Sequence, residues 1–126
     1  MILCDTNILR EFYKNNLQVV TKLRRIGQEE LAVSAVTQAE LYFGARSKAE
    51  LSQIKQHLAL LHHVPLDASI STTFLQLLET YSLSHKLSLT DAVIAATALS
   101  HDLELYTRNI NDFRFISGLK LHCQAE

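Results

Sequence analysis

Short apolar runs alternate along the chain with longer segments in which apolar residues recur every three or four positions. The short runs predict β-strands, and the longer segments predict amphipathic helices. Strands that are separated by helices form parallel sheets with helices on both faces. The expected fold class is therefore α/β, with three layers around a central parallel sheet of four to five strands. The predicted strands cover residues 2–4, 31–35, 63–67, 103–106 and 119–123.

Two local signals refine this outline. Thr37 and Glu40 have the spacing of a capping box, which predicts a helix that begins at Thr37. Pro65 has no backbone N–H to donate, so the third strand is expected at an edge of the sheet. No repeat or linker-like segment interrupts the pattern, and we expect a single domain over residues 1–126.

The composition bears on location and partners. No apolar run approaches the roughly 18 residues that span a bilayer, and no signal sequence precedes the first strand, so a cytoplasmic protein is expected. Cys4 and Cys123 show no redox or metal-binding spacing and are expected to be free thiols. A net charge of −1 gives no general attraction to nucleic acid, so RNA binding would need a local basic patch. Candidates for that patch are Lys22, Arg24, Arg25, Arg46, Lys48, Arg108 and Arg114.

Four acidic residues lie at positions where open α/β sheets bind their ligands. Ligands of open parallel sheets bind beyond the carboxyl ends of the strands, where helix N-termini also gather. Asp5 ends the first predicted strand, and Glu40 and Asp112 follow the second and the fourth. Asp91 lies in the first turn of the most apolar predicted helix, which is expected to be buried. We therefore expect these four carboxylates near one edge of the sheet.

Each of these acids, taken alone, also has a structural explanation, because carboxylates cap helices and stabilise their N-termini. Taken together they would repel one another unless a cation offset their charge. Mg²⁺ and Mn²⁺ prefer oxygen ligands and support phosphodiester cleavage. The six histidines lack the spacing of zinc hydrolases, and neither a phosphate-binding glycine loop nor a nucleophile elbow is present.

Four motifs, in this order, resemble the PIN-domain family and especially its VapC branch. They are ILCDTNIL at 2–9, VTQAEL at 36–41, LTDAVIAA at 89–96 and YTRNINDF at 106–113. The resemblance implies a PIN-like fold and a catalytic, metal-binding quartet of Asp5, Glu40, Asp91 and Asp112. It also implies supporting polar groups at Thr6, Asn7 and Thr107, with Asn109 as an alternative to Asp112 for the fourth ligand.

The same resemblance implies an activity and partners. The activity would be Mg²⁺- or Mn²⁺-dependent hydrolysis of RNA, with tRNA or ribosomal RNA as possible targets and Arg108 as a candidate substrate contact. The chain would be the toxin of a toxin–antitoxin pair. Its antitoxin would cover the acidic groove, often with an arginine, and the toxin would form a homodimer.

Three alternatives stay open on the sequence. A noncatalytic, receiver-like module would hold Mg²⁺ around a phosphorylated Asp67, although such a module carries paired acids after its first strand and here Thr6 follows Asp5. An inactive PIN scaffold would act only through its protein partner. DNA cleavage is the third, because contacts to the 2′-hydroxyl, which distinguish RNA, cannot be located in the sequence.

Overall fold

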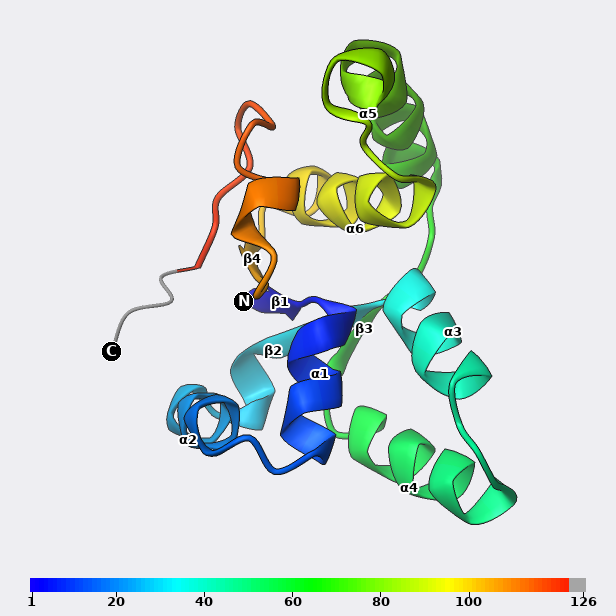
Figure 1. Cartoon of the computed structure of the whole chain (residues 1–126), viewed down its shortest axis with the longest axis vertical. Helices are drawn as coiled ribbons and strands as arrows, with labels where there is room; N and C mark the ends of the chain where they lie inside the picture. The colour runs from blue at the N-terminus through cyan, green and yellow to red at the C-terminus, as the bar shows by residue number, and fades with distance from the viewer. Residues whose placement is uncertain (123–126) are drawn as a thin grey trace.

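The sheet is parallel throughout, as the sequence predicts. The computed structural model describes residues 1–122, and within them four strands pair in the order β3-β2-β1-β4 (Figure 1). The third strand lies at an edge and ends just before Pro65, which agrees with the expectation for proline. The strands are β1 (Ile2–Cys4), β2 (Leu31–Ser34), β3 (His62–Val64) and β4 (Glu104–Tyr106).

Helices cover both faces of the sheet, so the predicted three-layer α/β fold is confirmed. Figure 1 shows α5 and α6 on one side and α1, α2 and α4 on the other. Among residues 1–122, no helix is both long and apolar enough to cross a membrane. The helices are α1 (Thr6–Tyr13), α2 (Leu17–Ile26), α3 (Ala35–Phe43), α4 (Lys48–Leu58), α5 (Ala68–His85) and α6 (Leu89–Ser100), with 3₁₀ turns η1 (Gln28–Glu30) and η2 (Ile110–Asp112).

Two hydrophobic cores lie on opposite faces of the sheet, because successive strand residues point in opposite directions. Leu3 packs with Ile94 of α6 in one core. Cys4 packs with Ile8 of α1 in the other, where burial, aided by the charge of Asp5, raises the pKa of its thiol to about 12. Cys4 is a free, neutral thiol, as expected, and Cys123 lies outside the described residues.

The predicted fifth strand is not formed as a strand. Leu121 makes one isolated parallel bridge to Leu105. In that bridge the Leu105 N–H donates to Lys120 O, and the His122 N–H donates to Leu105 O, both at 2.8 Å. The alternating pattern of residues 119–122 therefore produces a single pairing beside β4, and the rest of the predicted strand, Cys123, is outside the described residues.

The predicted capping box is wrong by three residues. Helix α3 begins at Ala35, and Ser34 is its N-cap, whose hydroxyl accepts from the Thr37 backbone N–H at 3.1 Å. Ser34 and Thr37 both fit the capping pattern by residue type, and the chain uses the first. Thr37 and Glu40 are consequently inside the helix, with their side chains free for other partners.

Replacing Ser34 with alanine should destabilise the fold by about 1 kcal/mol, the usual loss when a helix N-cap is removed. Urea unfolding of wild type and Ser34→Ala would measure this difference in the free energy of unfolding. Glu40→Gln serves as the comparison, and it should lose less stability, because Glu40 caps nothing in α3 and glutamine keeps an oxygen that can accept from Thr6 Oγ1. The opposite result, a stable Ser34→Ala and a destabilised Glu40→Gln, would restore the original capping box.

Candidate active site

The candidate site lies where the strand order changes direction. From β1 the chain adds β2 and then β3 on one side, whereas β4 pairs with the other side of β1. Such a switch point leaves a crevice at the carboxyl ends of the two neighbouring strands. Asp5 follows β1 directly and Thr107 follows β4, so both residues lie at this crevice.

Asp5 is held at both of its carboxylate oxygens. As the N-cap of α1 it accepts the Thr6 N–H on Oδ1 at 2.8 Å. The Thr107 hydroxyl donates to Oδ2 at 2.7 Å. Asp5 is only 5% exposed, and burial raises its pKa despite these two hydrogen bonds, with further repulsion from Glu40 and Asp112. The predicted capping role and a place in the acidic cluster are thus compatible in one side chain.

Glu40 reaches the same region from α3. The Thr6 hydroxyl lies 2.6 Å from Glu40 Oε1 and 2.9 Å from the hydroxyl of Thr37. Thr6 and Thr37 are both buried. Glu40 therefore contacts α1 through one side-chain hydrogen bond, to Thr6, and does not cap its own helix.

Asp91 enters from the first turn of α6. Ser88 is the N-cap of this helix, and its hydroxyl accepts the Asp91 backbone N–H at 3.1 Å. Burial raises the pKa of the Asp91 carboxyl to about 6, and repulsion from Asp5, Asp112 and Glu40 adds to the shift. A carboxyl that is so reluctant to ionise is a recognised mark of a functional site.

The segment after β4 supplies the fourth acid. Asp112 ends η2, and its charge contributes to the raised pKa values of both Asp5 and Asp91. The Asn109 backbone N–H donates to the Thr107 hydroxyl at 3.0 Å, so Asn109 supports Thr107 through its main chain. Asn109 is the N-cap residue of η2, and its side chain makes no capping hydrogen bond there.

The donor set fits a hard divalent cation. Carboxylate oxygens are joined by threonine hydroxyl oxygens, and the mutual repulsion of the acids would be relieved by positive charge. Over residues 1–122, no three acidic, histidine or cysteine side chains stand close enough to enclose an ion unaided. Mg²⁺ commonly binds through one or two carboxylates and keeps several waters, so a loose arrangement of this kind suits it.

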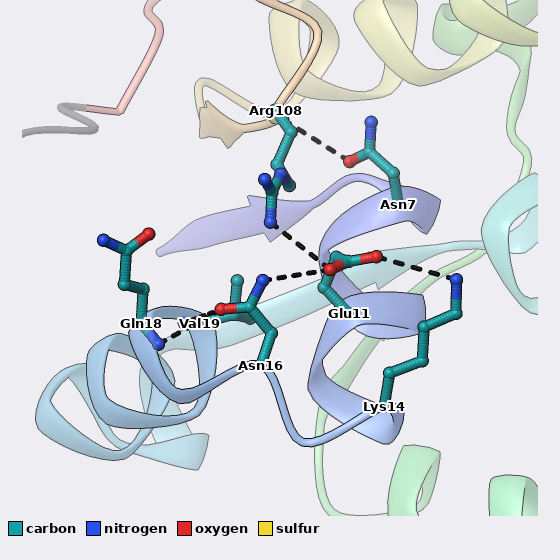
Figure 2. Close-up of polar contacts among 7 residues, drawn as sticks. All are labelled: Asn7, Glu11, Lys14, Asn16, Gln18, Val19 and Arg108. Carbon is teal, nitrogen blue, oxygen red and sulfur yellow. Dashed lines mark hydrogen bonds and ion pairs between the residues drawn. The ribbon is translucent and has the colours of Figure 1, made fainter.

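Arg108 lies at the rim of the site, beside Asn7. Its backbone N–H donates to Asn7 Oδ1 at 3.5 Å, and its guanidinium donates to Glu11 Oε1 at 3.4 Å (Figure 2). Glu11 also accepts from Asn16 at 3.0 Å and pairs with Lys14 at 3.7 Å. The Arg108 side chain is 45% exposed, so it is tethered but accessible.

A pocket of about 520 Å³ adjoins the acidic cluster through Glu40. It lies between α1, α3 and α4, and its floor includes apolar groups of Phe12, Leu41 and Ile54. The basic side chains of Arg10 and Arg46 also line it. It combines an apolar floor with charged walls, as expected of a site for a peptide or another ligand.

Asp67 has a structural role. It is the N-cap of α5, where its carboxylate accepts the Ile70 N–H at 2.8 Å, and it pairs with His101 at 2.9 Å. These contacts lower the pKa of Asp67, the opposite of the shifts at Asp5 and Asp91. A receiver-like role, with Asp67 as the phosphorylated group, gains no support from this arrangement.

Thr37 has a different role from the one that the capping pattern predicts. It does not cap α3, and its side chain instead lies against Thr6. Its position one helical turn before Glu40 places both on one face of α3, and that spacing was a signal for shared contacts.

The sequence and the fold are similar to those of known proteins. The model of the PIN domain family matches residues 2–117. Toxin FitB of Neisseria gonorrhoeae is 31% identical over 127 aligned positions, which cover 90% of this chain and 91% of that protein. The solved toxin-antitoxin complex from Klebsiella pneumoniae contains a chain 30% identical, with a TM-score of 0.83 and coverage of 100% of this chain and 99% of that chain.

A third similarity is to VapBC2 from Rickettsia felis, solved with a DNA fragment from its promoter. The matched chain is 25% identical, with a TM-score of 0.82 and coverage of 97% of this chain and 98% of that chain. Fold, strand-end acids and sequence similarity define one class of protein. The chain belongs to the PIN-domain family, among its VapC-type members, which confirms the resemblance read from the four motifs.

The raised pKa of Asp91 predicts how stability depends on pH when no metal is bound. The ordinary pKa of 3.8 applies to the unfolded chain, and the folded value is about 6. Between these values the folded state binds more protons, so the free energy of unfolding falls as the pH rises from about 4 to 6. Asp91→Asn should therefore match wild type near pH 4 and exceed it at pH 7 by about 1 kcal/mol, a value reduced for solvent screening.

Urea unfolding in EDTA at the two pH values would measure this effect. Asp67→Asn is the matched control, because the pKa of Asp67 is lowered and its loss should not stabilise the fold at pH 7. An Asp91→Asn variant less stable than wild type at pH 7 would contradict a pKa of Asp91 that is raised by burial and by the neighbouring acids.

Proposed function

We propose that this chain is the toxin of a toxin–antitoxin pair and a metal-dependent endoribonuclease. The observation that supports the proposal is that Glu40 and Asp112 raise the pKa of Asp5, and that these three acids together raise the pKa of Asp91, in a chain of the PIN-domain family. PIN-domain toxins are generally nucleases that use divalent metal ions. The reaction would be hydrolysis of an RNA phosphodiester bond, without a covalent enzyme intermediate.

The residues have distinct roles in this proposal. Asp5 and Asp91 would hold Mg²⁺ or Mn²⁺, because repulsion and burial make both carboxylates gain from a nearby cation. Glu40 and Asp112 would complete the metal-binding quartet, and Asp112 is preferred over Asn109 because its charge raises the pKa values of both Asp5 and Asp91. Bound metal would supply positive charge that activates the attacking water and offsets charge on the phosphate.

Thr6 and Thr107 would orient the carboxylates. Each donates a hydroxyl hydrogen bond to one acid, Thr6 to Glu40 and Thr107 to Asp5. The carboxylates then need not reorganise when substrate arrives, and such preorganisation favours catalysis. Asn7, which accepts from the Arg108 N–H, would position the rim of the site.

The proposed substrate is RNA, with tRNA and ribosomal RNA as possible targets, and this preference rests on the family. With a net charge of −1, binding depends on local cations, and Arg108 is the cation tethered at the rim. Cleavage of DNA is the alternative that the same acids could perform.

The proposed partner is an antitoxin, as in the complexes of the relatives. An arginine from such a partner would pair bidentately with the carboxylates and replace the metal's charge. The pocket beside Glu40 would accept an apolar segment of the same partner, since apolar groups of Phe12 and Ile54 line it. We also propose a cytoplasmic homodimer.

Purified protein, free of antitoxin, should cut RNA only when Mg²⁺ or Mn²⁺ is present. Asp91→Asn should reduce the rate by more than about 100-fold, because even residues that only support metal ligands contribute 10–100-fold. Gel analysis of total tRNA and a structured ribosomal RNA, with added metal or with EDTA, would measure this. A DNA oligonucleotide of the same sequence tests the alternative substrate.

Asp67→Asn is the control for that experiment. It makes the same chemical change outside the cluster, and asparagine caps helices as well as aspartate does, so activity should be retained. Full activity in EDTA, or equal losses in the two variants, would overturn the proposed metal-dependent site. Absence of cleavage by folded wild type on every RNA would favour a scaffold that acts through its partner.

Arg108→Ala should weaken RNA binding several-fold and reduce the slope of log affinity against log salt by about 1, as expected for one lost phosphate contact. Fluorescence anisotropy with a labelled single strand, in the Asp91→Asn background, measures binding without cleavage. Arg24→Ala is the control, because α2 leads into the amino end of β2, away from the site. An unchanged salt slope for Arg108→Ala would remove Arg108 from the interface.

A further inference from the structure

We propose that Thr37 is a positioning residue that holds Thr6 in place to orient Glu40. Its hydroxyl donates to Thr6 Oγ1, which directs the single hydroxyl proton of Thr6 to Glu40 Oε1. This inference rests on the proposed function and deepens it, because it assigns a role to a residue that is not among the proposed metal ligands.

The direction of the two hydrogen bonds follows from the number of protons. The Thr6 hydroxyl has one proton and lies close to two oxygens, at 2.6 Å from Glu40 and 2.9 Å from Thr37. The contact with Glu40 is the shorter of the two and has the length of a hydroxyl–carboxylate hydrogen bond, so the proton of Thr6 is assigned to Glu40. The contact with Thr37 can then form only if Thr37 is the donor. The chain of donors runs from Thr37 to Thr6 to Glu40.

The burial of Thr37 favours its hydroxyl as the donor to Thr6 Oγ1. Its exposed fraction is 0%, and that of Thr6 is 4%, so bulk water does not compete at this contact. Three other helical threonines, Thr72, Thr80 and Thr97, donate their hydroxyls to the carbonyl four residues earlier. Thr37 instead contacts a side chain 31 positions away in sequence.

The second carboxylate of the site is held by the same design. Thr107 donates to Asp5 Oδ2 at 2.7 Å, and its own oxygen accepts the Asn109 N–H at 3.0 Å. In both cases a threonine bonded to a carboxylate also accepts from a second donor. Such chains polarise each bond in them and favour one arrangement of the side chains. Thr37 therefore donates to the Thr6 hydroxyl in the same way that the Asn109 backbone N–H donates to the Thr107 hydroxyl.

Loss of the Thr37 hydroxyl would leave the Thr6 oxygen buried without its donor. Thr6 would then lose one of the two contacts that hold its side chain in a single rotamer, since threonine in a helix divides between two. Glu40 would be less well oriented toward the cation. Partners that orient metal ligands typically contribute 10–100-fold to metal affinity, and for this more distant partner we expect about 10-fold.

The test is Mn²⁺ binding measured by titration calorimetry on EDTA-stripped full-length protein. Thr37→Val removes the hydroxyl at nearly constant shape and should weaken binding about 10-fold. Thr37→Ser restores the hydroxyl and should return affinity to within about twofold of wild type, since the donor is regained. Thr97→Val is the matched control, because Thr97 is equally buried but donates to the Val93 carbonyl in α6.

Thermal unfolding of each variant, without metal, separates stability from orientation. Should Thr37→Val fail to fold, Thr37→Ala removes the same hydroxyl with a residue that favours helix. Weaker binding in Thr37→Val or Thr37→Ala, rescue by serine and normal binding in Thr97→Val would support the inference. Wild-type affinity in a folded Thr37→Val, or failure of serine to rescue, would overturn it. A folded wild type with no affinity for Mn²⁺ would instead overturn the proposed function.

Discussion

The hydrogen bond from Thr107 to Asp5 joins the two strand ends between which the site opens. Residues 5 and 107 are far apart in sequence, and parallel pairing of β1 with β4 brings them together. The remaining acids are placed relative to this pair by α3, α6 and η2. Because all these elements begin or end at one edge of the sheet, the position of Asp5 determines which side chains lie close enough to interact with its carboxylate.

The burial and mutual repulsion of these carboxylates lower the stability of the fold near neutral pH. Burial and repulsion raise the pKa values of Asp5 and Asp91, so ionising either one near neutral pH costs free energy. Threonine hydroxyls and backbone N–H groups reduce this cost at Asp5, which has two such donors. A cation would remove more of it. The strained carboxylates are thus the part of the molecule that gains most from binding, as expected when function and stability compete.

Periodicity and motif order predicted the layers, the four strands and the edge position of β3, because these depend on burial and local chain geometry. The capping box of Thr37 and Glu40 was wrong because Ser34 has the same chemistry and lies at the true end of β2. The fifth strand was reduced to one bridge at Leu121. The spacing of Thr37 and Glu40 predicts that they share a face of α3, but the contact of Thr37 with Thr6 could not be predicted, since it depends on packing between α1 and α3.

Capping a helix does not prevent a carboxylate from making contacts with other parts of the fold. Asp5 caps α1 with Oδ1 and accepts from Thr107 with Oδ2. Asp91 leaves the capping of α6 to Ser88, so its carboxylate is available to the cluster. Helix N-termini attract carboxylates for stability, and parallel sheets gather those N-termini at one edge. A cluster of acids there follows from ordinary helix chemistry, and what distinguishes this one is the pair of threonines that orient its members.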